Sequence, residues 1–179
     1  MSRGIVVVGG NGSGKTTLGK RLAALLGYTP IDIEQYAFAS CGDGAHEGNP
    51  YENPRSAKDI CALLQMDLPH YRGFVLSAVN GDFGEEINSW YEAVVYMEAP
   101  LAVRMERLRK RSLDRFGRRV LEGGDLYEQE QAFLAFAASR SLESIHAWLD
   151  RLPCPVICVD GTVPVEYNAH LVQTALARF

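Results

Sequence analysis

The sequence predicts a single α/β domain, residues 1–179, in which helices cover both faces of a five-stranded, largely parallel sheet. Apolar runs rich in β-branched residues alternate with stretches of helical periodicity along the chain, and this alternation is typical of parallel strands joined by helices. No internal repeat interrupts it. A chain of 179 residues, 47% of them apolar, buries about 70% of the surface that it exposes when unfolded, so one core is expected.

The predicted strands are short continuous apolar runs, because a strand covered on both faces shows no polar alternation. They span residues 5–8, 29–33, 74–79, 93–97 and 156–159. The stretch 40–54 is rich in Gly, Asn and Pro and predicts an irregular excursion.

The predicted helices fill the intervals between these strands. The first places leucines on one stripe from Leu18 onward and ends at Gly27. Pro100 suits the first turn of another, which turns Leu101, Met105 and Leu108 inward. A long helix is expected from about 126 to 149, and a last one over 165–178. By periodicity the core residues of the long helix are Phe133, Phe136, Ile145, Trp148 and Leu149.

Charge and composition restrict the partners. The formal net charge is -4, yet eight basic residues and two acidic ones fall between positions 104 and 119. A compact positive cluster on an acidic chain favours a small polyanion over nucleic acid, although many charge runs are solvated helix faces. No apolar run has the roughly 20 residues that span a bilayer, and no secretory signal pattern is present. We therefore expect no membrane or nucleic-acid partner, a cytoplasmic location and reduced thiols at the four cysteines.

Residues 9–16, GGNGSGKT, satisfy the pattern G-x-x-x-x-G-K-[ST] directly after a predicted buried strand and at the start of a helix. Glycines let successive backbone N–H groups point at phosphate oxygens, and the helix N-terminus adds partial positive charge. The motif predicts that the chain binds a nucleoside triphosphate. ATP is expected, with Mg²⁺ on Thr16, because no guanine-specifying N-K-x-D run is present. The predicted phosphate-binding residues are Gly9, Asn11, Gly12, Ser13, Gly14, Lys15, Thr16 and Thr17.

Three further segments resemble parts of the small P-loop kinases, namely the nucleoside monophosphate kinases with their shikimate and gluconate kinase relatives. Residues 95–100 (VYMEAP) and the arginines that follow are similar to the strand, proline and helix before the lid. Residues 114–125 are similar to a short lid, and residues 160–164 (DGTVP) to the loop beside adenine. The resemblance implies a P-loop NTPase three-layer α/β/α fold with a lid at about 112–125 and an acceptor-binding insertion at about 34–70.

The resemblance also implies roles for the basic cluster. Arg107 would lie over adenine, beside the loop residues Gly161, Thr162 and Pro164. Phosphoryl transfer requires positive charge around the transferred group. Arg111 would supply it from the helix, and Arg115, Arg118 or Arg119 from the lid, whereas Arg104 and Arg109 are compatible with solvated helix residues.

The acceptor side is predicted from Asp32-Ile33-Glu34. In an extended segment, residues two apart share one face, so both carboxylates would face the cleft at the carboxyl end of the strand. Acidic residues there resemble the D-x-D pair of shikimate kinases, so Asp32 would orient Mg²⁺ or act as a base and Glu34 would bind the acceptor. Arg55, at the head of a helix, would hold an acceptor phosphate or carboxylate.

The sequence departs from the family in two places. Ser77 stands where many P-loop enzymes have an Mg²⁺-linked Asp, a role that then falls to Asp82 or Asp32. Residues 77–86 also lack the G-F-P-R run with which adenylate kinases hold their acceptor, so Asn80 and Asp82 either bind a different acceptor or form a turn.

Together these features predict an ATP- and Mg²⁺-dependent phosphotransferase. It would act on a nucleoside monophosphate or a hydroxylated metabolite, and the oligomeric state is left open. The alternative is an ATP-binding switch or weak ATPase that acts through a protein partner. Ser77 favours that alternative, and the arginine-rich segment disfavours it, because a switch needs no positive charge around a transferring group.

Overall fold

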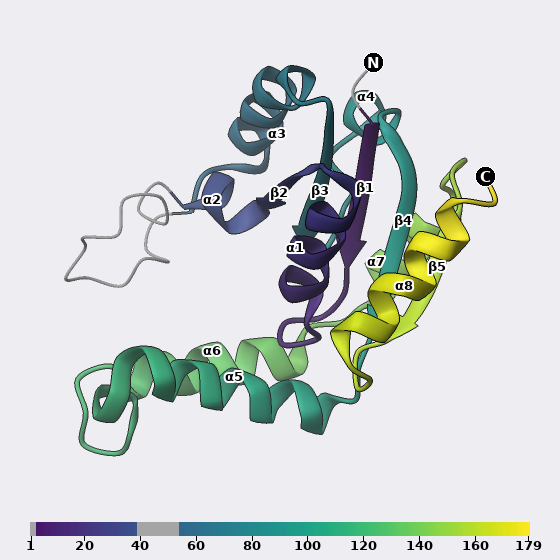
Figure 1. The fold of residues 1–179 in the computed structure, drawn as a ribbon. Helices are drawn as coiled ribbons and strands as arrows, with labels where there is room; N and C mark the ends of the chain where they lie inside the picture. Colours follow the sequence, from purple (N-terminus) through teal and green to yellow (C-terminus); the bar gives the residue numbers. More distant parts are fainter. Residues whose placement is uncertain (1–2, 39–53) are drawn as a thin grey trace.

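The computed structural model describes residues 3–38 and 54–179 of the chain (Figure 1). Its centre is a five-stranded sheet in the order β2-β3-β1-β4-β5, and every pair of neighbouring strands is parallel. The strands are β1 (Arg3–Val8), β2 (Thr29–Asp32), β3 (Gly73–Ala78), β4 (Tyr91–Glu98) and β5 (Val156–Asp160). The predicted α/β/α architecture with a parallel sheet is confirmed.

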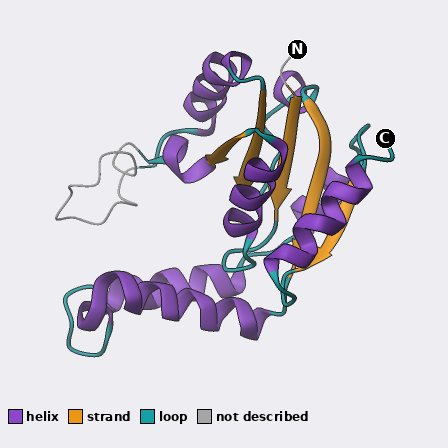
Figure 2. Ribbon diagram, in the orientation of Figure 1, coloured by secondary structure: helices purple, strands orange, loops and turns teal. Residues whose placement is uncertain are grey.

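Helices cover both faces of the sheet (Figure 2). On one face, α1 (Lys15–Leu26) and α8 (Val165–Leu176) pack against residues that alternate along β1, such as Ile5 and Val7. On the other face, Val6 and Val8 pack with side chains from α3 (Ala57–Asp67), α4 (Glu85–Asn88) and α7 (Glu143–Leu149). Burial of β1 on both faces is the reason for its unbroken apolar sequence.

Two long helices form a separate unit beyond the carboxyl ends of the strands. Helices α5 (Leu101–Phe116) and α6 (Tyr127–Ser139), joined through the short helix η3 (Gly117–Val120), lie side by side (Figure 1). Their contact has its own small core of Met105, Leu108, Leu134 and Ala137. We refer to α5, η3 and α6 as the helical hairpin.

The predicted long helix over 126–149 is wrong, because α6 ends at Ser139 and α7 begins at Glu143. The two helices face different partners: α6 packs on α5, whereas Ile145 and Trp148 of α7 pack on the sheet. The Ser141 hydroxyl accepts a hydrogen bond from the Glu143 N–H, which begins the second helix.

Two side chains expected in the core are exposed. Phe136 is 55% exposed, because it lies on the side of α6 away from α5, and Leu101 is 46% exposed in the first turn of α5. Of the other predicted core residues, Met105, Leu108, Ile145 and Trp148 are buried, and Phe133 and Leu149 are partly buried. The irregular excursion predicted for 40–54 lies, apart from its last residue, outside the described residues.

Short segments complete the described chain. The helix α2 (Ile33–Ala37) follows β2 directly, and η2 (Leu68–His70) continues α3. Across residues 3–38 and 54–179, no helix combines the length and the apolar character that a membrane span requires.

Candidate active site

The loop between β1 and α1 has the backbone conformation that a phosphate cradle needs. Gly12 and Gly14 have φ angles of 81° and 103°, a region that side chains rarely allow. A Cβ at Gly12 would also lie 2.5 Å from the Arg104 carbonyl oxygen, so the loop packs closely on α5. Asn11 Oδ1 and Ser13 Oγ are buried without a hydrogen-bond partner among the described residues. A loop with these features fits a bound triphosphate.

Lys15 is the first residue of α1, and its ammonium lies among charged groups of both signs. Burial lowers the pKa of Lys15 to about 8. Glu34 and Asp32 oppose this shift, while Arg111 and Arg140 add to it. Among the described residues, its Nζ donates a single long hydrogen bond, 3.4 Å to the Gly10 carbonyl. Lys15 thus lies close to both the carboxylates and the arginines, where a bound polyanion would accept hydrogen bonds from its ammonium and balance its charge.

Asp32 connects the phosphate loop to the far side of the site. The Thr16 hydroxyl donates to Asp32 Oδ2 over 3.1 Å, and Asp32 Oδ1 accepts from the Glu34 N–H. The second bond caps α2, so the extended arrangement expected for 32–34 is wrong: the chain turns helical at Ile33 because Asp is a good N-cap. Both carboxylates nevertheless line the same cavity.

The Thr16 hydroxyl and the Asp32 carboxylate fit a magnesium site. Mg²⁺ in nucleotide-binding proteins takes oxygen ligands from one or two protein groups and from the substrate phosphates. Across the described residues, no group of three or more His, Cys, Asp or Glu side chains could hold a metal. A magnesium ion at Thr16 and Asp32 would therefore complete its shell with phosphate and water oxygens.

Ser77, at the position of the expected family aspartate, contacts α1. It is 3% exposed and its hydroxyl donates to the Lys15 carbonyl over 3.4 Å. A Cβ at Gly19 would lie 2.3 Å from Ser77 Oγ. The serine therefore fits a close approach of α1 to β3 that leaves little room for a larger side chain.

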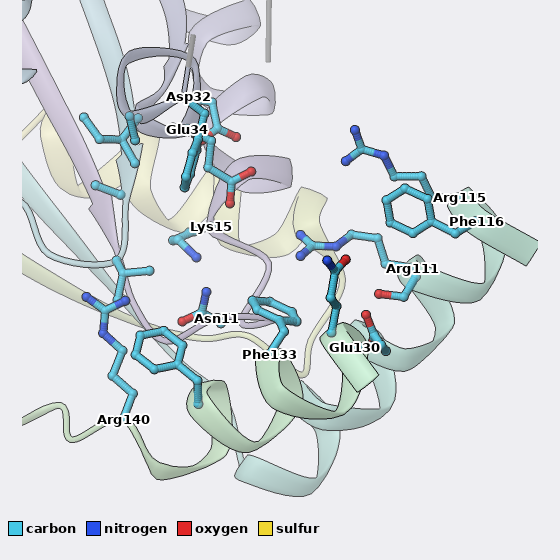
Figure 3. Close-up of a pocket in the computed structure, with 18 of the residues that line it drawn as sticks. Asn11, Lys15, Asp32, Glu34, Arg111, Arg115, Phe116, Glu130, Phe133 and Arg140 are labelled. Carbon is cyan, nitrogen blue, oxygen red and sulfur yellow. Dashed lines mark hydrogen bonds between the residues drawn. The ribbon is translucent and has the colours of Figure 1, made fainter. Parts of the chain in front are cut away.

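A cavity of about 450 Å³ opens between α2, the carboxyl end of β3 and the helical hairpin (Figure 3). Asn11 and Lys15 lie at the phosphate-loop end, with Asp32 and Glu34 on the α2 side. The hairpin side contributes four arginines, Arg111, Arg115, Arg119 and Arg140, and the guanidinium of Arg119 forms an ion pair with Asp125. The cavity thus brings together the phosphate-binding lysine, both predicted carboxylates and a set of cations.

Several predicted site residues lie outside the cavity or are engaged in local structural contacts. Arg118 is exposed in η3 and does not line the cavity. Arg55 donates to the Tyr36 carbonyl over 2.8 Å and so holds α2 to the segment before α3. Asn80 does line the cavity, but its Oδ1 accepts from the Asp82 N–H. Asp82 accepts from Gly84 N and Asn88 Nδ2, so Asn80 and Asp82 form a turn.

Arg107 connects the phosphate loop to the loop after β5. Its guanidinium donates to the Ser13 carbonyl over 3.1 Å and to the Gly161 carbonyl over 2.9 Å. The neighbouring Thr162 is fixed by hydrogen bonds of 2.7 Å to Asp160 Oδ1, and Pro164 precedes the first turn of α8. The residues predicted for the adenine end are therefore brought together, separately from the cavity.

Two arginines differ from the sequence-based expectation. Arg104 is 7% exposed and donates to the carbonyls of Ala99, at 3.2 Å, and Asn11, at 3.4 Å, so its interpretation as a solvated residue is wrong. Arg140 was missed because it was placed within one long helix; in the structure it ends α6 and faces the cavity. The Ser141-Leu142-Glu143 sequence, a helix-start pattern, is the signal that marks this break.

The fold and the phosphate loop together define a P-loop nucleotide-binding protein. Residues 5–122 match the model of the AAA domain family. The chain is 30% identical to the Bacillus subtilis (strain 168) protein YqaC, itself uncharacterised, over 187 aligned positions that cover 99% of each chain. The chain belongs to this AAA domain family.

Kinases are found among its more distant relatives. A shikimate kinase from Psychrobacter arcticus is 32% identical over 114 residues, which cover 59% of each chain. A gluconokinase from Sinorhizobium meliloti has a TM-score of 0.57 at 18% identity, with coverage of 98% of this chain and 92% of that one. A shikimate kinase from Acinetobacter baumannii has a TM-score of 0.58 at 20% identity, with coverage of 99% and 95%. These similarities confirm the small P-loop kinase fold.

Proposed function

We propose that the chain is an ATP- and Mg²⁺-dependent phosphotransferase that moves the γ-phosphoryl group to a small acceptor bound in the cavity. The observation that carries the proposal is the convergence of Lys15, Asp32 and the hairpin arginines on one cavity, with Asp32 accepting a hydrogen bond from Thr16 of the phosphate loop. The kinase relatives support the same reaction class. A bound magnesium ion would neutralise phosphate charge and orient the triphosphate.

The residues that line the cavity would each have a distinct role in the reaction. Lys15 holds the terminal phosphates, and Arg111 and Arg140 add positive charge from the hairpin side. Asp32 lies where it orients the acceptor hydroxyl or the ion, and Glu34 contacts the acceptor from α2. The helical hairpin acts as the lid that excludes water, which would otherwise compete as the acceptor.

An ATP-dependent switch is the competing function. Ser77 was the feature that favoured it, but Ser77 is engaged with the Lys15 carbonyl and α1. A switch also has no need for a 450 Å³ cavity beside the phosphate loop. The geometry therefore supports the phosphotransferase better.

The test is ATP consumption by the purified protein with Mg²⁺, alone and with pools of nucleosides, nucleoside monophosphates, sugar acids and shikimate. Lys15→Ala is measured in parallel, and Lys20→Ala, an exposed lysine of the same helix, is the matched control. We expect one pool to stimulate ADP formation, with the stimulation lost in Lys15→Ala and retained in Lys20→Ala. An ATPase rate that no pool changes would favour the switch.

A further inference from the structure

We infer that the acceptor carries a flat aromatic ring, which binds between phenylalanine side chains of the cavity; this inference rests on the proposed phosphotransferase function. Five phenylalanines line the one cavity: Phe38 and Phe83 on the side of the sheet and α2, and Phe116, Phe133 and Phe136 on the hairpin. Figure 3 shows Phe116 and Phe133 on hairpin helices opposite Asp32 and Glu34.

Phe136 is the cavity residue that points most clearly to a bound ligand. It lies on α6 with 55% of its surface exposed, although α6 buries Leu134 and Ala137 against α5. The Arg140 guanidinium lies 5.6 Å from the centroid of its ring, so the aromatic face is next to a cation. A large aromatic side chain exposed inside a cavity is a typical ligand contact.

The aromatic wall is distinct from the adenine end of the site. Arg107 joins Ser13 to Gly161 on the other side of the phosphate loop, and neither Arg107 nor Gly161 lines the cavity. The phenylalanines are therefore placed for the acceptor rather than for the ring of ATP.

The chemistry of the walls favours a ring over a polyol. Each hydroxyl of a sugar acid needs a hydrogen-bond partner when it leaves water, and phenylalanine offers none. A flat ring instead gains from stacking and edge contacts with aromatic side chains. The cavity is also lined by polar side chains, among them Asp32, Glu34, Gln129 and the arginines, so the acceptor would carry a polar group, a hydroxyl or a phosphate, beside its ring.

Two chemical sources fit this description: a nucleoside or nucleotide base, and a heteroaromatic alcohol such as pyridoxine. The experiment therefore measures phosphorylation of four acceptor sets: nucleosides, nucleoside monophosphates, heteroaromatic alcohols, and a non-aromatic set of gluconate and shikimate. Binding of each set is measured separately by calorimetry in the presence of Mg²⁺ and a non-hydrolysable ATP analogue. The first three arms tell the two sources apart.

The variants are Phe136→Leu, which keeps an apolar side chain without the ring, and Phe179→Leu as a control, since Phe179 is 80% exposed and does not line the cavity. We expect an aromatic set to be phosphorylated and Phe136→Leu to raise the KM or Kd of that acceptor about tenfold. The KM of ATP should stay unchanged, and the control should match the wild type. Because Phe136 is exposed, the variant is expected to fold.

The outcomes separate the two claims. Phosphorylation of gluconate or shikimate alone would overturn the aromatic inference and leave the phosphotransferase standing. Aromatic binding that Phe136→Leu weakens, without turnover of any set, would support the aromatic site and overturn the phosphotransferase. If no aromatic set binds or reacts, the inference is wrong.

Discussion

Replacing Arg104 with Ala should weaken both the fold and the ATP site. The guanidinium, 7% exposed, donates to the Ala99 carbonyl over 3.2 Å and to the Asn11 carbonyl over 3.4 Å. It also lies against the phosphate loop, because a Cβ at Gly10 would come within 2.5 Å of its Nη1. Arg104 thus fastens the loop to the start of α5.

The magnitude follows from these contacts. A hydrogen bond from a charged donor contributes about 1.5–3 kcal/mol to stability, and one of the two bonds of Arg104 is long. We therefore expect Arg104→Ala to lose about 2–3 kcal/mol. For a chain of this size that loss lowers Tm by about 4–12 °C.

The assay combines thermal unfolding with the KM of ATP. Arg109→Ala is the control, because Arg109 is exposed on the same helix. Arg104→Met keeps part of the apolar stem without the charge, so it separates packing from hydrogen bonding. A released Asn11 carbonyl should raise the KM of ATP about tenfold. If Arg104→Ala has a Tm within 2 °C of the wild type, a stability loss of roughly 1 kcal/mol or less, and an unchanged KM of ATP, the reasoning is refuted. A lower Tm with an unchanged KM would limit Arg104 to a structural role.

Three further perturbations test other parts of the site. The pKa of Lys15 is lowered to about 8 from 10.5, so between these values the unfolded chain binds more protons and this group should add stability as pH rises through that range. ATP binding at pH 8.5 should therefore be accompanied by proton uptake at Lys15. Calorimetry in buffers of different ionisation enthalpy would detect this uptake, which should vanish in Lys15→Met. Arg107→Ala breaks the link between Ser13 and Gly161 and should raise the KM of ATP by roughly tenfold, about the effect of one charged hydrogen bond; a change confined to the acceptor's KM would contradict this. Asp82→Ala loosens a turn and should lower Tm by about 2–4 °C with the acceptor's KM unchanged, whereas a large rise of that KM would return Asp82 to the binding site.

Features encoded by nearby residues were predictable from the sequence. The apolar run of β1, the glycine-rich loop and Lys15 follow one another directly, so periodicity and spacing place them. The alternation of strands and helices also led to the parallel sheet, and the resemblance to the small P-loop kinases led to Arg107 beside Gly161.

Features that depend on tertiary partners were not predictable in the same way. Asp32 ends a strand and caps a helix, and the sequence alone does not show which of these two preferences determines the backbone at Glu34. Arg104 resembles its exposed neighbours in the basic run, and only its position against the phosphate loop distinguishes it. Arg140 reaches the cavity because α6 stops there, which depends on the separate packing of α6 and α7.

The basic run on α5 is best understood as one helical stripe. Arg104, Arg107, Arg111 and Arg115 recur every three or four residues, so they lie along one side of the helix. In order, they brace the phosphate loop, join it to the loop after β5, and then line the cavity. A single helix therefore spans the adenine end and the acceptor end of the proposed site. Since the same helix forms half of the helical hairpin, a displacement of the hairpin that moved Arg111 and Arg115 would also act on the contacts of Arg104 and Arg107 with the phosphate loop.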